Sequence, residues 1–363
     1  MNIKKIGKYL LLVMIIPAIL AGCGSVDQDV KSASSSDQND KVYEFDFNGP
    51  TPSTHPYFEK VVNPWAEFVE QETEGRVKIN VYSSAALGST NTAYEDIEGG
   101  VYDIGFVSPG FQGDTDLFPL TILELPFAVS NPEEYQKIAK KYNDEYMSES
   151  FENSIILGFG STDANQLYSK EPVETIKDVK SQKIVTMGAE KTKVVEEWGG
   201  TPVSLGVEQI YESLERNMID QALYNGTGAI GIKMFEVAPN LTKVDMGVAS
   251  IIHIMNKDSF NKMPEDLQKK FTEVLGPKLE ELTVELYQSQ AENAITEFEN
   301  IVKDKGGKVT IPSEAELLKF KKASKGVWDE WIKDANKKGY PGEEMMESFK
   351  KLLTEEGIQV PFK

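Results

Sequence analysis

The sequence predicts an α/β protein whose folded part divides into two domains. Strand-like and helix-like patterns alternate along the chain, which is typical of sheets with helices packed on their faces. A second series of such elements begins near Gln166. The folded part spans about 320 residues, a length that suits two domains better than one.

The first series of elements runs from residue 42 to residue 158. Residues 42–47 alternate apolar and polar side chains and predict a strand. Asn63-Pro64 then offers a helix cap with proline at the first helical position, and Gly75 ends that helix. Further strands are predicted at 77–81, 102–107 and 155–158, and further helices at 90–98 and 131–147. The short connections imply largely parallel sheets.

The second series predicts strands at 183–185, 202–205 and 218–224, with helices at 191–198 and 207–216. From Pro277 to Lys305 nothing interrupts a helical pattern. A helix of that length would reach roughly 43 Å and would cross both domains. Two shorter helices with a bend are the alternative. A strand at 308–311 and helices that hold Trp328 and Trp331 complete the chain.

The N-terminus has the features of an export signal. Three lysines precede an apolar run that ends in Leu20-Ala21-Gly22-Cys23. This tetrapeptide resembles a bacterial lipobox, so residues 1–22 are predicted to be a lipoprotein signal peptide and Cys23 the lipid attachment site. An ordinary cleavage site beside a chance cysteine is the alternative. Residues 23–41 would then form a disordered tether, because they carry almost no apolar side chain.

Lipidation would anchor the protein to the outer face of the cell membrane. A single-membrane host is favoured, because an untethered protein would diffuse away from it. In a double-membrane host the protein would lie on the periplasmic side.

Composition excludes several functions. The formal charge of −20 argues against nucleic acid as a partner. Two histidines and one cysteine leave little for a zinc site or a catalytic triad, so no metal or cofactor is expected. The sequence also lacks the nucleophile, zinc-protease and phosphate-loop motifs of common enzymes.

Seven short segments, in order, resemble motifs of one family. The chain is similar to the DctP-type extracytoplasmic solute receptors of tripartite ATP-independent periplasmic (TRAP) transporters. The segments that carry the resemblance are 74–79 (EGRVKI), 86–88 (ALG), 98–104 (EGGVYDI), 124–127 (ELPF), 176–184 (IKDVKSQKI), 200–203 (GTPV), and 208–211 (EQIY) together with 218–220 (MID).

The resemblance implies a two-domain periplasmic-binding-protein (Venus-flytrap) architecture with a long helix spanning both domains. Domain I would comprise residues 42–163 plus 250–288, and domain II residues 164–249 plus 289–363. Such a receptor is not an enzyme. It would be a monomer that traps a small solute between its domains and passes it to a permease of a small (DctQ-like) and a large (DctM-like) membrane subunit. A substrate-binding lipoprotein of an ABC importer and a surface-anchored enzyme remain alternatives.

The sequence departs from the family at the position of its carboxylate clamp. The family's arginine falls at Val185 here, and a second arginine found in some members falls at Asn165. Guanidinium groups pair with carboxylates in a bidentate manner, so their loss argues against a conventionally clamped carboxylate. A neutral, apolar-faced or cationic solute is expected instead, unless a lysine substitutes for the arginine (Lys170, Lys183 or Lys193).

Alignment with the family gives the candidate ligand-binding residues, and His55 and Phe111 lie in neighbouring loops. Asn48 could instead form a turn, His55 and Asp163 could cap backbone, and Tyr224 could pack in the core. The candidates are Asn48, Ser108, Asp163, Asn165, Val185, Met187, Tyr224 and Asn225.

Overall fold

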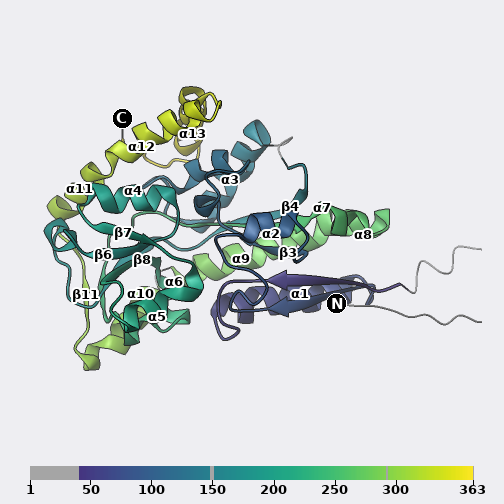
Figure 1. Ribbon diagram of the computed structural model, residues 1–363, viewed down its shortest axis with the longest axis horizontal. Helices are drawn as coiled ribbons and strands as arrows, with labels where there is room; N and C mark the ends of the chain where they lie inside the picture. The colour runs from purple at the N-terminus through teal and green to yellow at the C-terminus, as the bar shows by residue number, and fades with distance from the viewer. Residues whose placement is uncertain (1–40, 148–150, 292, 363) are drawn as a thin grey trace, which may run out of the picture. The chain divides into compact units, whose positions relative to one another are not determined.

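The computed structural model describes residues 41–147, 151–291 and 293–362, and residues Val42–Lys363 form one compact unit (Figure 1). The predicted signal peptide, Cys23 and nearly all of the predicted tether lie outside the described residues. Among the helices that the structure describes, none combines the length and apolar character needed to cross a bilayer.

The first sheet, sheet A, has five strands in the order β2-β1-β3-β10-β4. Strand β1 runs parallel to β2 and β3, whereas β10 runs antiparallel to β3 and β4. Their bounds are β1 (Tyr43–Asn48), β2 (Val77–Tyr82), β3 (Ile104–Val107), β4 (Ser154–Ser161) and β10 (Ser250–Asn256). The helices that follow these strands in the chain or pack on them are α1 (Asn63–Glu72), α2 (Ala93–Glu98), α3 (Pro132–Tyr146), α7 (Lys257–Asn261), α8 (Glu265–Lys270) and α9 (Gly276–Gln290).

The second sheet, sheet B, has six strands in the order β11-β9-β5-β8-β6-β7. Strand β5 runs antiparallel to its neighbours β8 and β9, and the other pairs are parallel. The strands are β5 (Asn165–Ser169), β6 (Lys183–Thr186), β7 (Thr201–Ser204), β8 (Gln221–Asn225), β9 (Asn240–Thr242) and β11 (Lys308–Thr310). The remaining helices are α4 (Ala189–Glu197), α5 (Ile210–Glu215), α6 (Gly226–Gly231), α10 (Asn293–Val302), α11 (Glu314–Ala323), α12 (Lys325–Lys337) and α13 (Gly342–Glu355).

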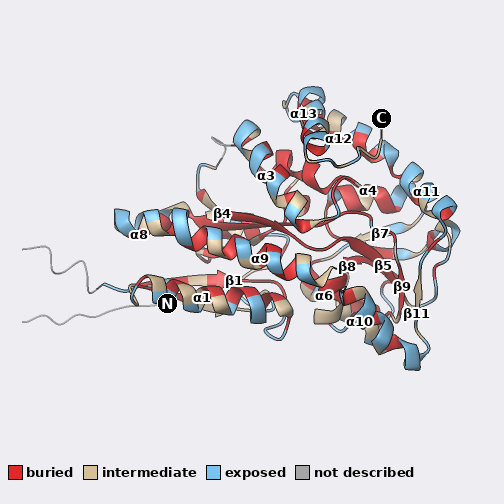
Figure 2. Ribbon diagram, turned by 180° about the vertical axis from the view of Figure 1, so that it is seen from behind, coloured by how far each residue is buried: buried red, intermediate tan, exposed pale blue. Residues whose placement is uncertain are grey.

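Both sheets are mixed rather than largely parallel, because β10 in sheet A and β5 in sheet B each run antiparallel to both of their neighbours. The predicted strands all occur, with ends shifted by a few residues. Strands β5, β9 and β10 were not predicted from the sequence. Strand β10 is buried along its whole length, so it shows none of the polar alternation that marks a half-exposed strand. Figure 2 shows the neighbouring strands β5 and β8 of sheet B in the red of buried residues as well.

Three connections of the chain join sheet A and sheet B. Strand β4 leads into β5, β9 leads back into β10, and α9 leads into α10. Helix α9 packs on β4, whereas α10 packs on α6 and beside β11. The predicted helical segment therefore does serve both sheets, as two helices rather than one.

The first two connections are tied together by backbone hydrogen bonds. The Thr162 amide donates to the Ala249 carbonyl at 2.9 Å, and the Asn165 amide donates to the Gly247 carbonyl at 2.7 Å. These bonds make the connections a paired two-strand link.

The C-terminal helices fix a buried segment that later forms part of the site. Residues Phe118–Glu124 form a 3₁₀ segment whose side chains are all buried. The indole of Trp331 donates to the Thr121 hydroxyl at 2.8 Å, and the indole of Trp328 donates to the Pro126 carbonyl at 3.1 Å. Helix α12 thereby holds the segment that ends at Glu124.

Candidate functional site

A pocket lies between the two sheets and is lined by residues that both sheets position. Sheet A contributes the loops that follow β1 and β3, where His55 and Ser108 lie. Sheet B contributes Met187, directly after β6, and Tyr224, at the end of β8. The carboxyl ends of parallel strands therefore converge on the pocket, which is where α/β proteins commonly bind ligands.

The pocket is lined only by uncharged side chains of the described part of the chain. The apolar and aromatic ones are Phe106, Phe111, Met187, Val207, Tyr224, Ala249, Ile251 and Tyr287. The polar ones are Thr51, His55, Thr90, Ser108, Thr162 and Asn225.

Four of the six polar side chains are committed to bonds within the protein. Ser108 Oγ donates to Glu124 at 3.2 Å, and Thr90 Oγ1 donates to Glu208 at 3.0 Å. Thr162 Oγ1 donates to the backbone at 2.8 Å, and the Asn225 amide donates to Asp163 at 2.8 Å. These groups shape the wall but have few donors left for a ligand.

The other two polar side chains have unused hydrogen-bonding atoms. Thr51 Oγ1 and His55 Nε2 are buried and have no hydrogen-bond partner among the described residues. His55 Nδ1 accepts the backbone N–H of Tyr57 at 3.0 Å. Burial lowers the pKa of His55 to about 4, so the ring is neutral at pH 7. Because Nδ1 is an acceptor, the proton of the neutral ring lies on Nε2, which becomes a free donor.

The two walls of the pocket touch each other directly. A Cβ atom placed on Gly188 would lie only 2.8 Å from the Gly110 backbone, and the φ of Gly188 is +103°, so both space and conformation require glycine there. Similarly, a Cβ atom placed on Gly231 of α6 would lie 2.0 Å from Cδ2 of His55. With the Thr90–Glu208 hydrogen bond, these contacts close the pocket between the sheets.

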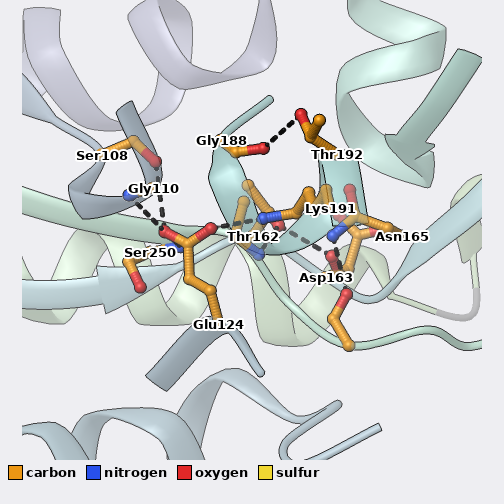
Figure 3. Close-up of polar contacts among 12 residues, drawn as sticks. Ser108, Gly110, Glu124, Thr162, Asp163, Asn165, Gly188, Lys191, Thr192 and Ser250 are labelled. Atoms are coloured by element: carbon orange, nitrogen blue, oxygen red, sulfur yellow. Dashed lines mark hydrogen bonds and ion pairs between the residues drawn. The ribbon is translucent and has the colours of Figure 1, made fainter. Parts of the chain in front are cut away.

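A buried ion pair lies directly behind Ser108 (Figure 3). Lys191 of α4 binds the carboxylate of Glu124, and both side chains are 1% exposed. Glu124 also accepts the backbone N–H groups of Gly110 at 3.4 Å and Ser250 at 3.2 Å. These bonds compensate the carboxylate, which would otherwise be costly to bury. The network joins the segment after β3, the start of β10 and the helix after β6.

A second carboxylate beside this pair is not compensated in the same way. Glu190 is buried, and burial together with the nearby charge of Glu124 raises its pKa to about 7. Its Oε2 atom has no hydrogen-bond partner among the described residues. Glu190 is therefore partly protonated near neutral pH.

Asp163 holds the start of α6. Its carboxylate accepts the side-chain amide of Asn225 at 2.8 Å and the backbone N–H groups of Gly226 at 2.7 Å and Thr227 at 3.3 Å. Burial raises the pKa of Asp163, and these hydrogen bonds oppose that effect. Asp163 therefore caps the backbone at the start of α6, which is the capping role that the sequence left open for it.

The structure brings together four of the eight candidate residues. Ser108, Met187, Tyr224 and Asn225 line the pocket, as do His55 and Phe111. The other four candidates do not line the pocket; they are Asn48, Asp163, Asn165 and Val185. The Asn48 side chain binds the backbone of residues 87 and 88, and that of Asn165 donates to the Gly247 carbonyl. Val185 is fully buried in a hydrophobic core.

None of the lysines considered as clamp substitutes lines the pocket. Lys170 contacts Asn217, Lys193 contacts Asp334, and Lys183 is exposed. Sequence reasoning missed the pairing of Lys191 with Glu124, because a lysine in the first turn of a helix is usually solvated. It also gave Thr51 no role. The one available signal was the position of Glu124 within the motif 124–127.

A pocket between two α/β sheets that are joined by paired crossover strands is the arrangement expected of a solute-binding protein that closes about a hinge. The sequence profile described as "Bacterial extracellular solute-binding protein, family 7" (DctP) matches residues 47–334. The chain belongs to this family, which confirms the resemblance seen in its motifs.

Relatives and solved structures agree with this assignment. The chain is 24% identical over 308 residues to the "Outer membrane transporter protein TsaT" of Comamonas testosteroni, covering 82% of this chain and 87% of the relative. It is similar in fold to a TRAP solute-binding protein of Rhodoferax ferrireducens in complex with benzoate, with a TM-score of 0.79, 21% identity and coverage of 87% and 99%.

A further fold match is a marine metagenome TRAP solute-binding protein specific for aromatic acid ligands, in complex with 3-hydroxybenzoate. The TM-score is 0.77, the identity 22% and the coverage 87% and 99%. The two-domain architecture expected from the sequence is thereby confirmed.

Proposed function

We propose that this protein is the lipid-anchored, extracytoplasmic solute receptor of a TRAP transporter. It would capture a small organic solute in the pocket between the sheets and deliver it to the small and large subunits of a membrane permease. The observation that supports this most is the enclosed pocket built by both sheets, whose walls meet at Gly110–Gly188 and Thr90–Glu208.

The connections between the sheets fit closure by bending about a hinge. Three segments cross between sheets A and B, and hinge motion needs only a few backbone angles in such segments to change. We propose domain boundaries near residues 163, 249 and 288, close to these crossings. The contacts between the walls would form on closure and break on opening.

The solute is proposed not to be a carboxylate held by a conventional arginine clamp. Val185 occupies the family's arginine position and lies in the core, and the described lining has no charged side chain. Bidentate pairing with a guanidinium is therefore not available within the pocket.

Native mass spectrometry of the mature protein, released from membranes by a mild detergent, tests receptor function. We expect a fraction of molecules to carry one small organic compound, and we expect solution scattering to show a more compact form when that compound is added. Failure to retain any compound, together with a scattering profile that no growth-medium fraction alters, would refute the receptor function.

The anchor and the transporter class require separate measurements. Cys23→Ser should release the protein from the membrane, and mass spectrometry of the N-terminal peptide should find a lipid on Cys23. Crosslinking in intact membranes should join the protein to permease subunits. Recovery of an ATPase subunit would instead favour an ABC importer.

A further inference from the structure

We infer that His55 is a specificity-determining hydrogen-bond donor, and that the pocket takes an uncharged solute with an apolar body and a carbonyl-type acceptor. This inference rests on the proposed receptor function and names the solute class for the same pocket. It follows from which polar groups of the pocket are already used, from the charges around it and from the chemistry of its walls.

The first step concerns the donor. His55 lines the pocket, and its Nδ1 atom accepts the Tyr57 N–H, which leaves Nε2–H buried and without a partner in the described chain. The side chain is 1% exposed, so water does not readily serve this donor. Thr51 Oγ1, four residues earlier, is also buried and unpartnered. An acceptor atom on a ligand would relieve the cost of leaving these groups unsatisfied.

The second step concerns charge. Lys191, a fully buried cation, is already neutralised by Glu124, the partner of the lining residue Ser108. Burial and, to a smaller extent, the charges of Asp163 and Glu208 raise the pKa of Tyr224, and the same carboxylates disfavour an anion. A cation gains little from Asp163, because three N–H donors already bind that carboxylate. Burying a charge without a partner is far more costly than burying a carbonyl that meets a donor.

The third step concerns the body of the solute. Four aromatic rings and Met187 line the pocket, and such walls favour a flat or apolar ligand. The walls therefore bind by apolar contact, while His55 selects the acceptor.

Three probes of nearly equal shape test the charge preference. Benzamide is neutral, benzoate is an anion and benzamidinium is a cation. Calorimetric titration should give benzamide a Kd of about 1 mM or below. Benzoate and benzamidinium should bind at least about tenfold more weakly, because each buries an unpaired charge. Tighter binding of either charged probe, or no binding of benzamide at about 10 mM, would overturn the inference.

Two variants of His55 separate its two nitrogen atoms. His55→Asn keeps an acceptor near the position of Nδ1, and so the bond to the Tyr57 N–H, but removes the unpartnered donor at Nε2. His55→Gln keeps a donor near the position of Nε2 and loses that backbone bond. We expect His55→Asn to bind benzamide about 3- to 10-fold more weakly with little change in melting temperature. His55→Gln should bind within about threefold of the unchanged protein but melt at a lower temperature.

These outcomes distinguish the solute class from the receptor function. Equal benzamide affinity in the unchanged protein and in His55→Asn would show that His55 does not select the solute. Preference for benzoate would overturn the neutral class while supporting a receptor. Only the absence of any retained compound and of any compaction would count against the receptor itself.

Discussion

Replacing Lys191 with methionine should strongly destabilise the protein. Methionine keeps the length and the apolar stem of lysine but removes the ammonium group that binds Glu124. Both side chains of the pair are 1% exposed, so water cannot replace the lost partner without local opening. The carboxylate would remain buried beside Glu190, whose own pKa is raised in part by the charge of Glu124.

The magnitude follows from the bonds that remain. Removing one partner of a buried ion pair costs about 3–5 kcal/mol. Glu124 retains its hydrogen bonds from Ser108, Gly110 and Ser250. We therefore expect the free energy of unfolding to fall by about 3 kcal/mol, at the lower end of that range. The loss should shrink as the pH falls, because an unpaired buried carboxylate has a raised pKa and becomes neutral by binding a proton.

The double variant Glu124→Gln/Lys191→Met supplies the control. With both charges removed, the glutamine at position 124 can still accept hydrogen bonds from the backbone. The double variant should therefore lose less unfolding free energy than the two single variants lose together. The coupling free energy should be about 2 kcal/mol. Urea unfolding followed by tryptophan fluorescence measures all four proteins. A Lys191→Met variant within about 1 kcal/mol of the unchanged protein, or strictly additive single variants, would refute this account of the pair.

Two further predictions concern closure and pH. Gly231→Ala places a methyl group 2.0 Å from His55 Cδ2, so solute affinity should fall and scattering should show a more open form. Gly113→Ala is the matched control, since a Cβ atom there meets nothing within 4 Å, and it should bind normally. His253 is buried and accepts or donates a 2.7 Å bond with the Tyr57 hydroxyl, and burial lowers its pKa from 6.5 to about 3. Its stabilising contribution is therefore complete above pH 6.5 and is lost as the pH falls towards 3, by about 2 kcal/mol between pH 7 and pH 5. His253→Gln should reduce the pH dependence of urea unfolding by that amount, and an unchanged pH profile would show that His253 is not buried in its neutral form.

The sequence was informative where one face of an element meets water. Residues 43–47 and 77–81 alternate, and both form strands close to the predicted bounds. Strand β10 escaped prediction because all seven of its residues are buried, including Ser250, His253 and Asn256. Burial on both faces removes the alternation on which strand prediction depends.

The site was harder to predict than the fold, because roles depend on contacts between distant residues. His55 was considered either a capping residue or a ligand contact, and it has features of both: Nδ1 binds local backbone, and the side chain also lines the pocket. Lys191 has no local signal at all. Its role depends on Glu124, which lies 67 residues earlier in the chain. Such pairs emerge only when the sheets are placed together.

The pattern of paired and unpaired groups around the pocket has a consequence for how closure is driven. A receptor that binds a carboxylate through an arginine depends on the ligand to supply the opposite charge. Here Glu124 follows a strand of sheet A and Lys191 follows a strand of sheet B, so the chain itself supplies both charges. Closure then requires no charge from the solute, and its selectivity reduces to apolar fit and to the free N–H of His55.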